Sequence, residues 1–351
     1  MPRYLCALWA GGGNVGPFLC LAAHLQQRGH EVAAVATTSL ASPLSAAGVT
    51  LAGSPDGWLP TAGDLLAAAD AHAPDVVIVD YMLTDALCGA EQVEAATVAL
   101  VHTLYRELLV DGAPHPIGMA GPVEALNPGR SAAGLPPIAR HADLLAAADL
   151  VLVAAPRALD AAGDVPPNVQ YSGPLLEGPG PDEGWEPPAG SGPLVAVSLG
   201  TTGDPAAEVP VLRRVIEALG GMAVRGLVTA PPAVEVDDLG PPPPNVAISG
   251  YVRHAAVLPH TDVLVTHAGL GTVNAALAHG VPMVALPFER EQPDNARALV
   301  RLGAGVALPT DAPVDDLRDA LAGQLARSSS PHVTVDPAPT VDLLEGLAQR
   351  G

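Results

Sequence analysis

The stretch VLVTHAGLGTVNAALAHGVPMVALPFEREQPDNA, residues 263–296, decides which fold we expect for this chain. A short apolar run ends at His267, and Gly269 and Gly271 then open a helical pattern with Thr272 in its first turn. Glycine lets the main chain approach an anion closely, and the free N–H groups at a helix start favour negative charge. The pattern predicts a strand, a turn and a helix that bind a diphosphate, with His267 as a further donor. An ordinary strand–turn–helix junction is the alternative interpretation.

Short apolar runs alternate with Ala/Leu-rich helical patterns on both sides of this stretch. Apolar strands separated by helices are typical of parallel sheets that are covered on both faces. The Pro/Gly-rich segment 172–193 interrupts the alternation, which restarts with LVAVSLG at 194–200. We therefore predict two Rossmann-like, doubly wound α/β domains, 1–171 and 194–351, joined by this linker. Ligands bind at the carboxyl ends of such strands, so we expect the two domains to face each other across a cleft. The final helical pattern is of uncertain placement and could pack back on the first domain.

The charge and composition of the chain exclude several classes of function. Acidic residues outnumber basic ones by 37 to 16 in 351 residues, which gives a formal net charge of −21. This balance argues against a surface for nucleic acid or for an anionic membrane. The chain contains no lysine, which excludes a Walker A lysine, a pyridoxal Schiff base and a lysine nucleophile.

The cysteines and the apolar segments predict a cytoplasmic protein. Cys6, Cys20 and Cys88 lie in apolar runs and do not have the spacing of metal ligands. This usage is typical of a reducing compartment. A leader pattern is not found at the start, and the apolar runs are shorter than the about 20 residues that span a bilayer.

Taken together, the motifs resemble the donor-binding signature of family 1 glycosyltransferases, the GT-B enzymes that use nucleotide-activated sugars. The segments that match in order are YVRHAAVLPH (251–260), HAGLGT (267–272), GVP (280–282) and EQPDNA (291–296). The glycine-rich loop before Pro17, RGHEV (28–32) and NPGRSAAGLPP (127–137) resemble other parts of the same family. The resemblance implies a GT-B fold and the inverting transfer of a sugar, of the bacterial natural-product type.

The resemblance also implies a set of donor-binding residues. Tyr251 stands where the family places a tryptophan that stacks on the nucleobase, and the main chain at Val252 would bind the base edge. The pyrophosphate would be bound by His267, Gly269, Gly271, Thr272 and Thr201. Glu291 and Gln292 occupy the family's Asp-Gln positions, which hydrogen-bond the sugar hydroxyls. Glutamate has one methylene more than the family's aspartate, so the arrangement of sugar hydroxyls that it prefers is an open question.

One departure from the family concerns the donor nucleotide. Members that use ribose nucleotides carry a glutamate that binds the ribose hydroxyls, whereas this chain has Ala275 at that position. A donor without the 2′-hydroxyl does not need this carboxylate, which favours a TDP-sugar over a UDP-sugar, although Asn274 could compensate. A D-x-D motif is absent, so we expect neither a bound divalent cation nor a cofactor. The nucleotide sugar would be a substrate.

A second departure concerns the general base. Most relatives carry a histidine three residues before the loop proline, where this chain has Asn14, and the aspartate that orients the histidine corresponds to Asp80. An amide cannot accept a proton near neutral pH. Either Asp80 or His102 is the base, or the acceptor needs little deprotonation and Asn14 orients it. In the third alternative the chain is a non-catalytic, nucleotide-sugar-binding partner of an active transferase. A buried histidine without a catalytic role is the alternative for His102.

The segment between residues 53 and 74, in the expected acceptor-binding domain, is shorter than in relatives. Only about twenty residues separate GVTLAG (48–53) from Pro74, where relatives usually place extra acceptor-contacting helices. We expect a small-molecule acceptor and, because of the shortened wall, a natural product that is bulky or preassembled.

Overall fold

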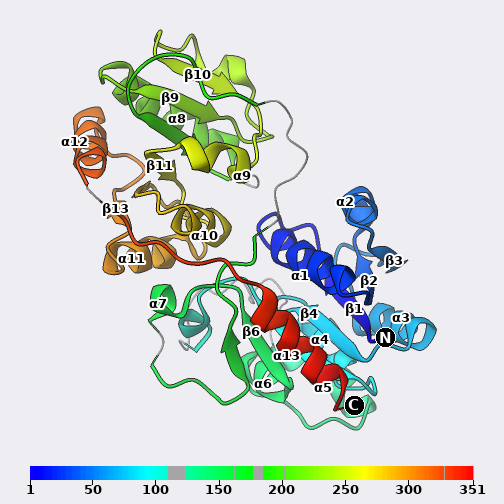
Figure 1. The fold of residues 1–351 in the computed structure, drawn as a ribbon. Coiled ribbons are helices and arrows are strands. Elements are labelled where there is room, and N and C mark those ends of the chain that lie inside the picture. The colour runs from blue at the N-terminus through cyan, green and yellow to red at the C-terminus, as the bar shows by residue number, and fades with distance from the viewer. Residues whose placement is uncertain (110–122, 162, 177–184, 201–202, 328, 351) are drawn as a thin grey trace. The chain divides into compact units, whose positions relative to one another are not determined.

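The computed structural model describes the chain except residues 110–122, 162, 177–184, 201–202, 328 and 351 (Figure 1). The chain divides into two compact units. Unit 1 consists of Met1–Leu176 and Val335–Gly351, and unit 2 consists of Glu177–Thr334. Residues 335–351 therefore belong to unit 1 and not to the second of the expected domains. The expected linker, 172–193, lies partly outside the described residues.

Unit 1 is built on a parallel sheet of seven strands in the order β3-β2-β1-β4-β5-β6-β7. The strands are β1 (Arg3–Leu8), β2 (Glu31–Ala36), β3 (Thr50–Gly53), β4 (Val76–Asp80), β5 (Ala96–Val101), β6 (Leu150–Val153) and β7 (Val169–Tyr171). The helices are α1 (Val15–Gln27), α2 (Ala41–Ala46), α3 (Ala62–His72), α4 (Thr84–Ala90), α5 (Asn127–Ala132), α6 (Ala142–Ala147), α7 (Arg157–Asp160) and α13 (Ala338–Ala348). The central strands are buried on both faces, which explains why they appear in the sequence as continuous apolar runs.

One face of the unit 1 sheet is covered by α1, α2 and α13. Alternate strand residues such as Tyr4, Cys6 and Leu8 pack there with Leu21 of α1 and Leu344 of α13. Helices α3 and α4 contact each other, and each also contacts a strand, β1 and β4 respectively. The last helix of the chain is therefore part of the core of the first unit.

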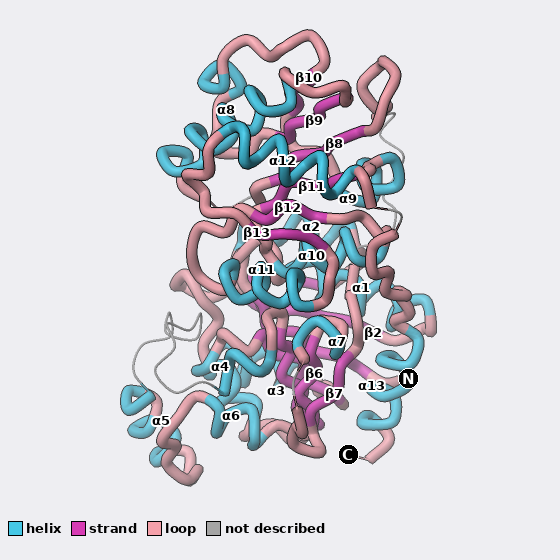
Figure 2. Tube along the Cα trace, turned by 90° about the vertical axis from the view of Figure 1, so that its left-hand side faces the viewer, coloured by secondary structure: helices cyan, strands magenta, loops and turns pink. Residues whose placement is uncertain are grey.

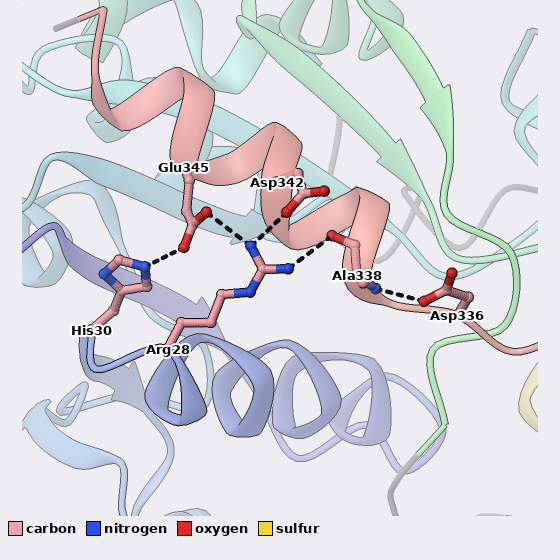
Figure 3. Close-up of polar contacts among 6 residues, drawn as sticks. All are labelled: Arg28, His30, Asp336, Ala338, Asp342 and Glu345. Atoms are coloured by element: carbon pink, nitrogen blue, oxygen red, sulfur yellow. Dashed lines mark hydrogen bonds and ion pairs between the residues drawn. The ribbon is translucent and has the colours of Figure 1, made fainter.

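Charged side chains attach α13 to the end of α1 (Figure 3). Arg28 follows α1 and donates to Asp342 Oδ1 at 2.5 Å and to Glu345 Oε2 at 2.9 Å. His30 Nε2 lies 2.6 Å from Glu345 Oε1. Asp336 accepts a hydrogen bond of 3.0 Å from the main-chain N–H of Ala338, at the start of α13. The contacts of Arg28 and His30 join segments more than 300 residues apart in the chain.

Unit 2 repeats the architecture with a parallel sheet of six strands in the order β10-β9-β8-β11-β12-β13 (Figure 2). The strands are β8 (Leu194–Ser198), β9 (Arg225–Thr229), β10 (Val246–Ser249), β11 (Val263–Thr266), β12 (Met283–Ala285) and β13 (Gly305–Ala307). The helices are α8 (Pro205–Gly220), α9 (His254–Val257), α10 (Leu270–Ala278), α11 (Gln292–Arg301) and α12 (Val314–Leu325). Valines of β8 and β11 pack against α8 and α12 on one face of the sheet. The expectation of two parallel α/β sheets is confirmed.

Candidate functional site

Three predicted residues of unit 1 meet at the carboxyl edge of its sheet. Asp80 is the last residue of β4 and is completely buried. Its Oδ2 accepts from Asn14 Nδ2 at 2.8 Å, and its Oδ1 lies 3.1 Å from His102 Nε2. The main-chain N–H of Met82 also donates to Oδ1, at 3.0 Å. The three side chains meet because they follow β1, β4 and β5, which are neighbours in the sheet.

The orientation of the Asn14 amide follows from its two partners. Its Nδ2 donates to the carbonyl oxygen of Trp9 at 2.9 Å as well as to Asp80. A main-chain carbonyl only accepts, so the nitrogen of the amide must face Trp9. The Oδ1 atom is buried and lacks a hydrogen bond among the residues that the structure describes. It lies beside Gly11, where an added Cβ would come within 2.9 Å of it. Asn14 is thus a donor to Asp80.

The contact with Asp80 also defines the protonation pattern of His102. An ionised carboxylate only accepts, so Nε2 is assigned as the nitrogen that donates to Asp80, and in the neutral tautomer with this hydrogen bond the lone pair is on Nδ1. Nδ1 forms no hydrogen bond within the described part of the chain. The His102 ring packs edge-on against the Tyr81 ring, with 4.9 Å between centroids. The arrangement is an aspartate that orients a histidine whose second nitrogen can accept a proton.

In unit 2, the main-chain path after β11 matches the turn that the sequence predicts. The strand ends at Thr266, and α10 begins at Leu270 with Gly269 as its N-cap residue. Gly269 lies at the amino end of a nine-residue helix, where the first N–H groups have no partner within the helix. An added Cβ at Gly271 would meet nothing within 4 Å, so this position is open to an approaching group. Thr272 is buried in the first turn.

The His267 ring lies between two glycines. A Cβ at Gly200 would lie 2.8 Å from its Cε1 atom, and a Cβ at Gly269 would come closer still to its Nε2 atom. Burial is the largest cause that lowers the pKa of His267, from 6.5 to about 4. The neighbouring charges of His254 and Arg290 lower it further, against the effect of a main-chain hydrogen bond at Ser198. At neutral pH the ring is therefore uncharged and carries one N–H group.

Glu291 and Gln292, the predicted sugar-binding pair, lie at the start of α11. Gln292 Oε1 accepts from the main-chain N–H groups of Phe288, at 2.9 Å, and Glu289, at 3.3 Å. Only its Nε2 group is left to bind a sugar hydroxyl. Glu291 Oε2 is buried without a hydrogen bond among the described residues, and it lies 3.8 Å from Arg290 Nε.

Three further residues are predicted to bind the donor: Tyr251, Val252 and Thr201. Tyr251 and Val252 lie in the loop between β10 and α9, and Tyr251 is 65% exposed, as an aromatic side chain that stacks on a ligand would be. Thr201 lies outside the described residues.

The sequence does not single out three residues of unit 2, two at the turn after β11 and one on α8. Ala268 has a left-handed backbone with φ of 66°, and the buried Asn295 donates to its carbonyl oxygen. Glu208 of α8 is 3% exposed and lies directly beside Gly203. Burial, and then the charge of Asp204, raises the pKa of Glu208 from 4.5 to about 7. Asn295 is part of the EQPDNA motif, which was the available signal, whereas Glu208 lies in an ordinary helical pattern.

Groups of three or more His, Cys, Asp or Glu side chains with a geometry suited to a metal ion are not found in the part of the chain that the structure describes. Among the described helices, none is both long enough and apolar enough to cross a membrane.

Known proteins match this chain in sequence. Residues 213–334 match the family model described as Erythromycin biosynthesis protein CIII-like, C-terminal domain. The chain is 35% identical over 188 residues to 4'-demethylrebeccamycin synthase of Lentzea aerocolonigenes. The matched region covers 51% of this chain and 43% of that protein. It is 34% identical over 181 residues to demethyllactenocin mycarosyltransferase of Streptomyces fradiae, with 46% and 37% covered. The chain thus spans less than half the length of these curated relatives.

Solved structures match almost the whole chain. The glycotransferase of kitacinnamycin superposes with a TM-score of 0.78 at 26% identity and covers 99% of this chain and 94% of its own. Glycosyltransferase VinC in complex with dTDP superposes with a TM-score of 0.76 at 20% identity, covering 99% and 100%. The fold of the chain is therefore the GT-B fold. In sequence and fold the chain is similar to glycosyltransferases of natural-product pathways, in agreement with the resemblance seen in its motifs.

Proposed function

We propose that the protein transfers a sugar from a nucleoside diphosphate to a natural-product acceptor, with inversion at the anomeric carbon. The observation that carries this proposal is the turn between β11 and α10. There a neutral His267 lies between two glycines beside the open amino end of a helix. Uncharged donors of this kind suit a diphosphate in a chain that contains no lysine.

In the proposed reaction the acceptor oxygen attacks the anomeric carbon while the bond from that carbon to the diphosphate oxygen breaks. The negative charge that develops on the leaving diphosphate is stabilised by the main-chain N–H groups around Gly269 and Gly271, by Thr272 and by His267. Thr201 is proposed to assist. Tyr251 would stack on the base, with the main chain of Val252 at the base edge.

The proton of the acceptor hydroxyl passes to His102 Nδ1 in this proposal. Asp80 is completely buried, and both of its oxygens already accept hydrogen bonds, so it orients His102 and stabilises the imidazolium that forms. Asn14 keeps the Asp80 carboxylate in place by donating to its second oxygen. Of the alternatives for the base, the geometry favours His102.

The donor is proposed to be a TDP-sugar in preference to a UDP-sugar. Ala275 is buried in α10 and offers no carboxylate for a ribose 2′-hydroxyl, and dTDP is the nucleotide named with the structurally similar VinC. Glu291 and the Nε2 group of Gln292 would bind the sugar hydroxyls. We propose no metal ion or cofactor, since neutral donors perform the stabilisation that a cation would supply.

The acceptor is proposed to be a bulky natural product. Between β3 and α3 the chain has only the loop 54–61, which includes Trp58. Trp58 is 60% exposed, and its ring packs edge-on against Trp9, with 5.2 Å between centroids. A short loop with an exposed aromatic ring suits a large acceptor better than a deep enclosed pocket does.

Nucleotide binding and donor turnover test this function. We expect TDP to bind more tightly than UDP in calorimetry, and GDP not to bind. Purified protein should slowly release TDP from TDP-glucose, measured by ion-exchange chromatography, with the same rate in EDTA. A preference for GDP would contradict the donor assignment. Nucleotide binding without any release of TDP from TDP-glucose would support the alternative function, a non-catalytic partner of an active transferase, which Asn14 at the usual base position suggests.

A further inference from the structure

Ala268 adopts a backbone conformation that alanine disfavours. Its φ is 66°, in the left-handed region, and its side chain is completely buried. A residue with a Cβ loses roughly 1 kcal/mol or more in this region relative to the right-handed one. Such a conformation persists only when its surroundings hold it, and here it lies between His267 and the helix cap Gly269.

Two buried side chains hold both polar main-chain groups of Ala268. Asn295 Nδ2 donates to the Ala268 carbonyl oxygen at 2.9 Å, and Thr266 Oγ1 accepts from the Ala268 N–H at 3.1 Å. Asn295 and Thr266 are both completely buried. Asn295 Oδ1 has no hydrogen bond among the described residues, so the bond to Ala268 is the polar contact that this amide makes there.

Asn295 reaches this turn from another part of the motif. It lies in the first turn of α11, three residues after Gln292, whose Oε1 accepts from the main chain of Phe288 and Glu289. Residues three apart lie on the same side of a helix. The start of α11 therefore holds two loops at once, the one that precedes it and the one that follows β11.

We propose that Asn295 is a positioning residue that keeps Ala268 in the left-handed conformation, so that His267 and the N–H groups at the start of α10 point at the same diphosphate. Rotation about φ of Ala268 changes the direction of the chain on one side of it relative to the other. Without Asn295 the backbone relaxes toward negative φ, and His267 no longer points the same way as the N–H of Gly269. This inference rests on the proposed function, since its ligand is the diphosphate of the donor.

Calorimetry with TDP tests the proposal. Asn295→Ala should weaken TDP binding about tenfold, the effect of losing one well-placed buried hydrogen bond. Ala268→Gly alone should change affinity by less than about twofold, since glycine adopts positive φ freely. The double variant should bind TDP more tightly than Asn295→Ala, because glycine removes the backbone preference that Asn295 opposes. A role in packing alone predicts no such rescue, since glycine only adds flexibility.

Asn245 provides a matched control. Its side-chain amide also holds main-chain carbonyls of unit 2, those of Leu219, Met222 and Val224, but it precedes β10 and so lies at the amino edge of the sheet. Asn245→Ala should lower the melting temperature and leave TDP affinity unchanged.

The outcomes separate this inference from the proposed function. Wild-type protein that binds neither TDP nor UDP contradicts the proposed function. Wild-type binding that Asn295→Ala leaves unchanged, or a loss that Ala268→Gly does not reduce, overturns the inference. If Asn295→Ala does not fold, Thr266→Val replaces it, because it keeps the side-chain volume and removes the acceptor for Ala268 N–H. The same loss and the same rescue by Ala268→Gly are then expected, and their absence overturns the inference.

Discussion

His102 Nε2 lies 3.1 Å from Asp80 Oδ1, so the buried carboxylate at the end of β4 contacts a histidine that follows β5. The other Asp80 oxygen is taken by Asn14. The pair of a carboxylate and an imidazole is therefore present, with the imidazole supplied by a different strand of the same sheet.

Replacing His102 by glutamine should reduce glycosyl transfer by at least about a hundredfold, the usual contribution of a general base. TDP affinity should not change, because the donor turn lies in the other unit. Release of TDP from TDP-glucose, with and without an acceptor phenol, measures the first effect, and calorimetry measures the second. His24→Gln is a suitable control, since that ring contacts the carbonyl of Cys20 within α1. Full activity in His102→Gln would exclude this histidine as the base.

Asn14→Asp should destabilise the protein in a pH-dependent way. The change keeps the shape of the side chain but removes both donors and places a second carboxyl against Asp80. Two adjacent buried carboxyls cannot both ionise easily, so the pKa of one is raised in the folded state. Stability should therefore fall as pH rises above about 4, with a loss of roughly 3 kcal/mol or more at pH 8.

Denaturation by urea at pH 5 and pH 8 measures this difference. Asn14→Ala loses the same hydrogen bonds without adding a charge, so its loss should be similar at both pH values. An Asn14→Asp variant as stable as wild type at pH 8 would mean that the amide does not face Asp80 as described.

The sheets could be predicted from the sequence to a large extent, because buried parallel strands appear as short apolar runs. The edge strands Val169–Tyr171 and Gly305–Ala307 do not stand out in the sequence, since three residues are too few to show a pattern. The attachment of residues 335–351 to the first unit combines apolar packing with pairs that Arg28 and His30 form with charges far along the chain. Periodicity carries no information about such pairing.

The candidate site was predictable in its residue types but not in its hydrogen bonds. The family resemblance points to Asn14 and Asp80, with His102 as an alternative base, but the carbonyl of Trp9 that orients the amide is a main-chain group that leaves no trace in the sequence. The left-handed Ala268 is equally hidden, because nothing about an alanine indicates positive φ. The roles in donor binding and catalysis remain predictions.

Glu208→Gln should make the protein more stable in alkaline solution. Burial raises the pKa of Glu208 from 4.5 to about 7, so the folded state favours the neutral acid. As pH rises from about 4.5 through 7, the unfolded state gives up this proton first, and stability is lost. The loss is at most about 3.5 kcal/mol, from the rise in pKa from 4.5 to about 7 at about 1.4 kcal/mol per pKa unit.

Urea denaturation at pH 5.5 and 8.5 should thus show a smaller decrease for Glu208→Gln than for wild type. Glu217→Gln, on the exposed side of the same helix, should behave as wild type. Equal decreases in Glu208→Gln and wild type would mean that this carboxyl is already ionised at pH 5.5.

Glu345→Gln should loosen α13 without unfolding unit 1. Glu345 contacts both His30 and Arg28, and these partners, the hydrogen bond from His30 first, lower the pKa of its carboxyl. A lowered pKa means that the stabilisation is present above the ordinary value of 4.5 and is lost as pH falls below it. The side chains are partly exposed, so the expected loss is only about 0.5–1 kcal/mol.

Amide hydrogen exchange of Leu344 and Leu347 at pH 7 should accelerate several-fold, because local opening reports small local losses. Asp342→Asn should accelerate exchange less, since the Asp342 side chain is 66% exposed and its ion pair in the described part of the chain is with Arg28. Unchanged exchange in Glu345→Gln would show that apolar packing of α13 alone holds the helix on the sheet.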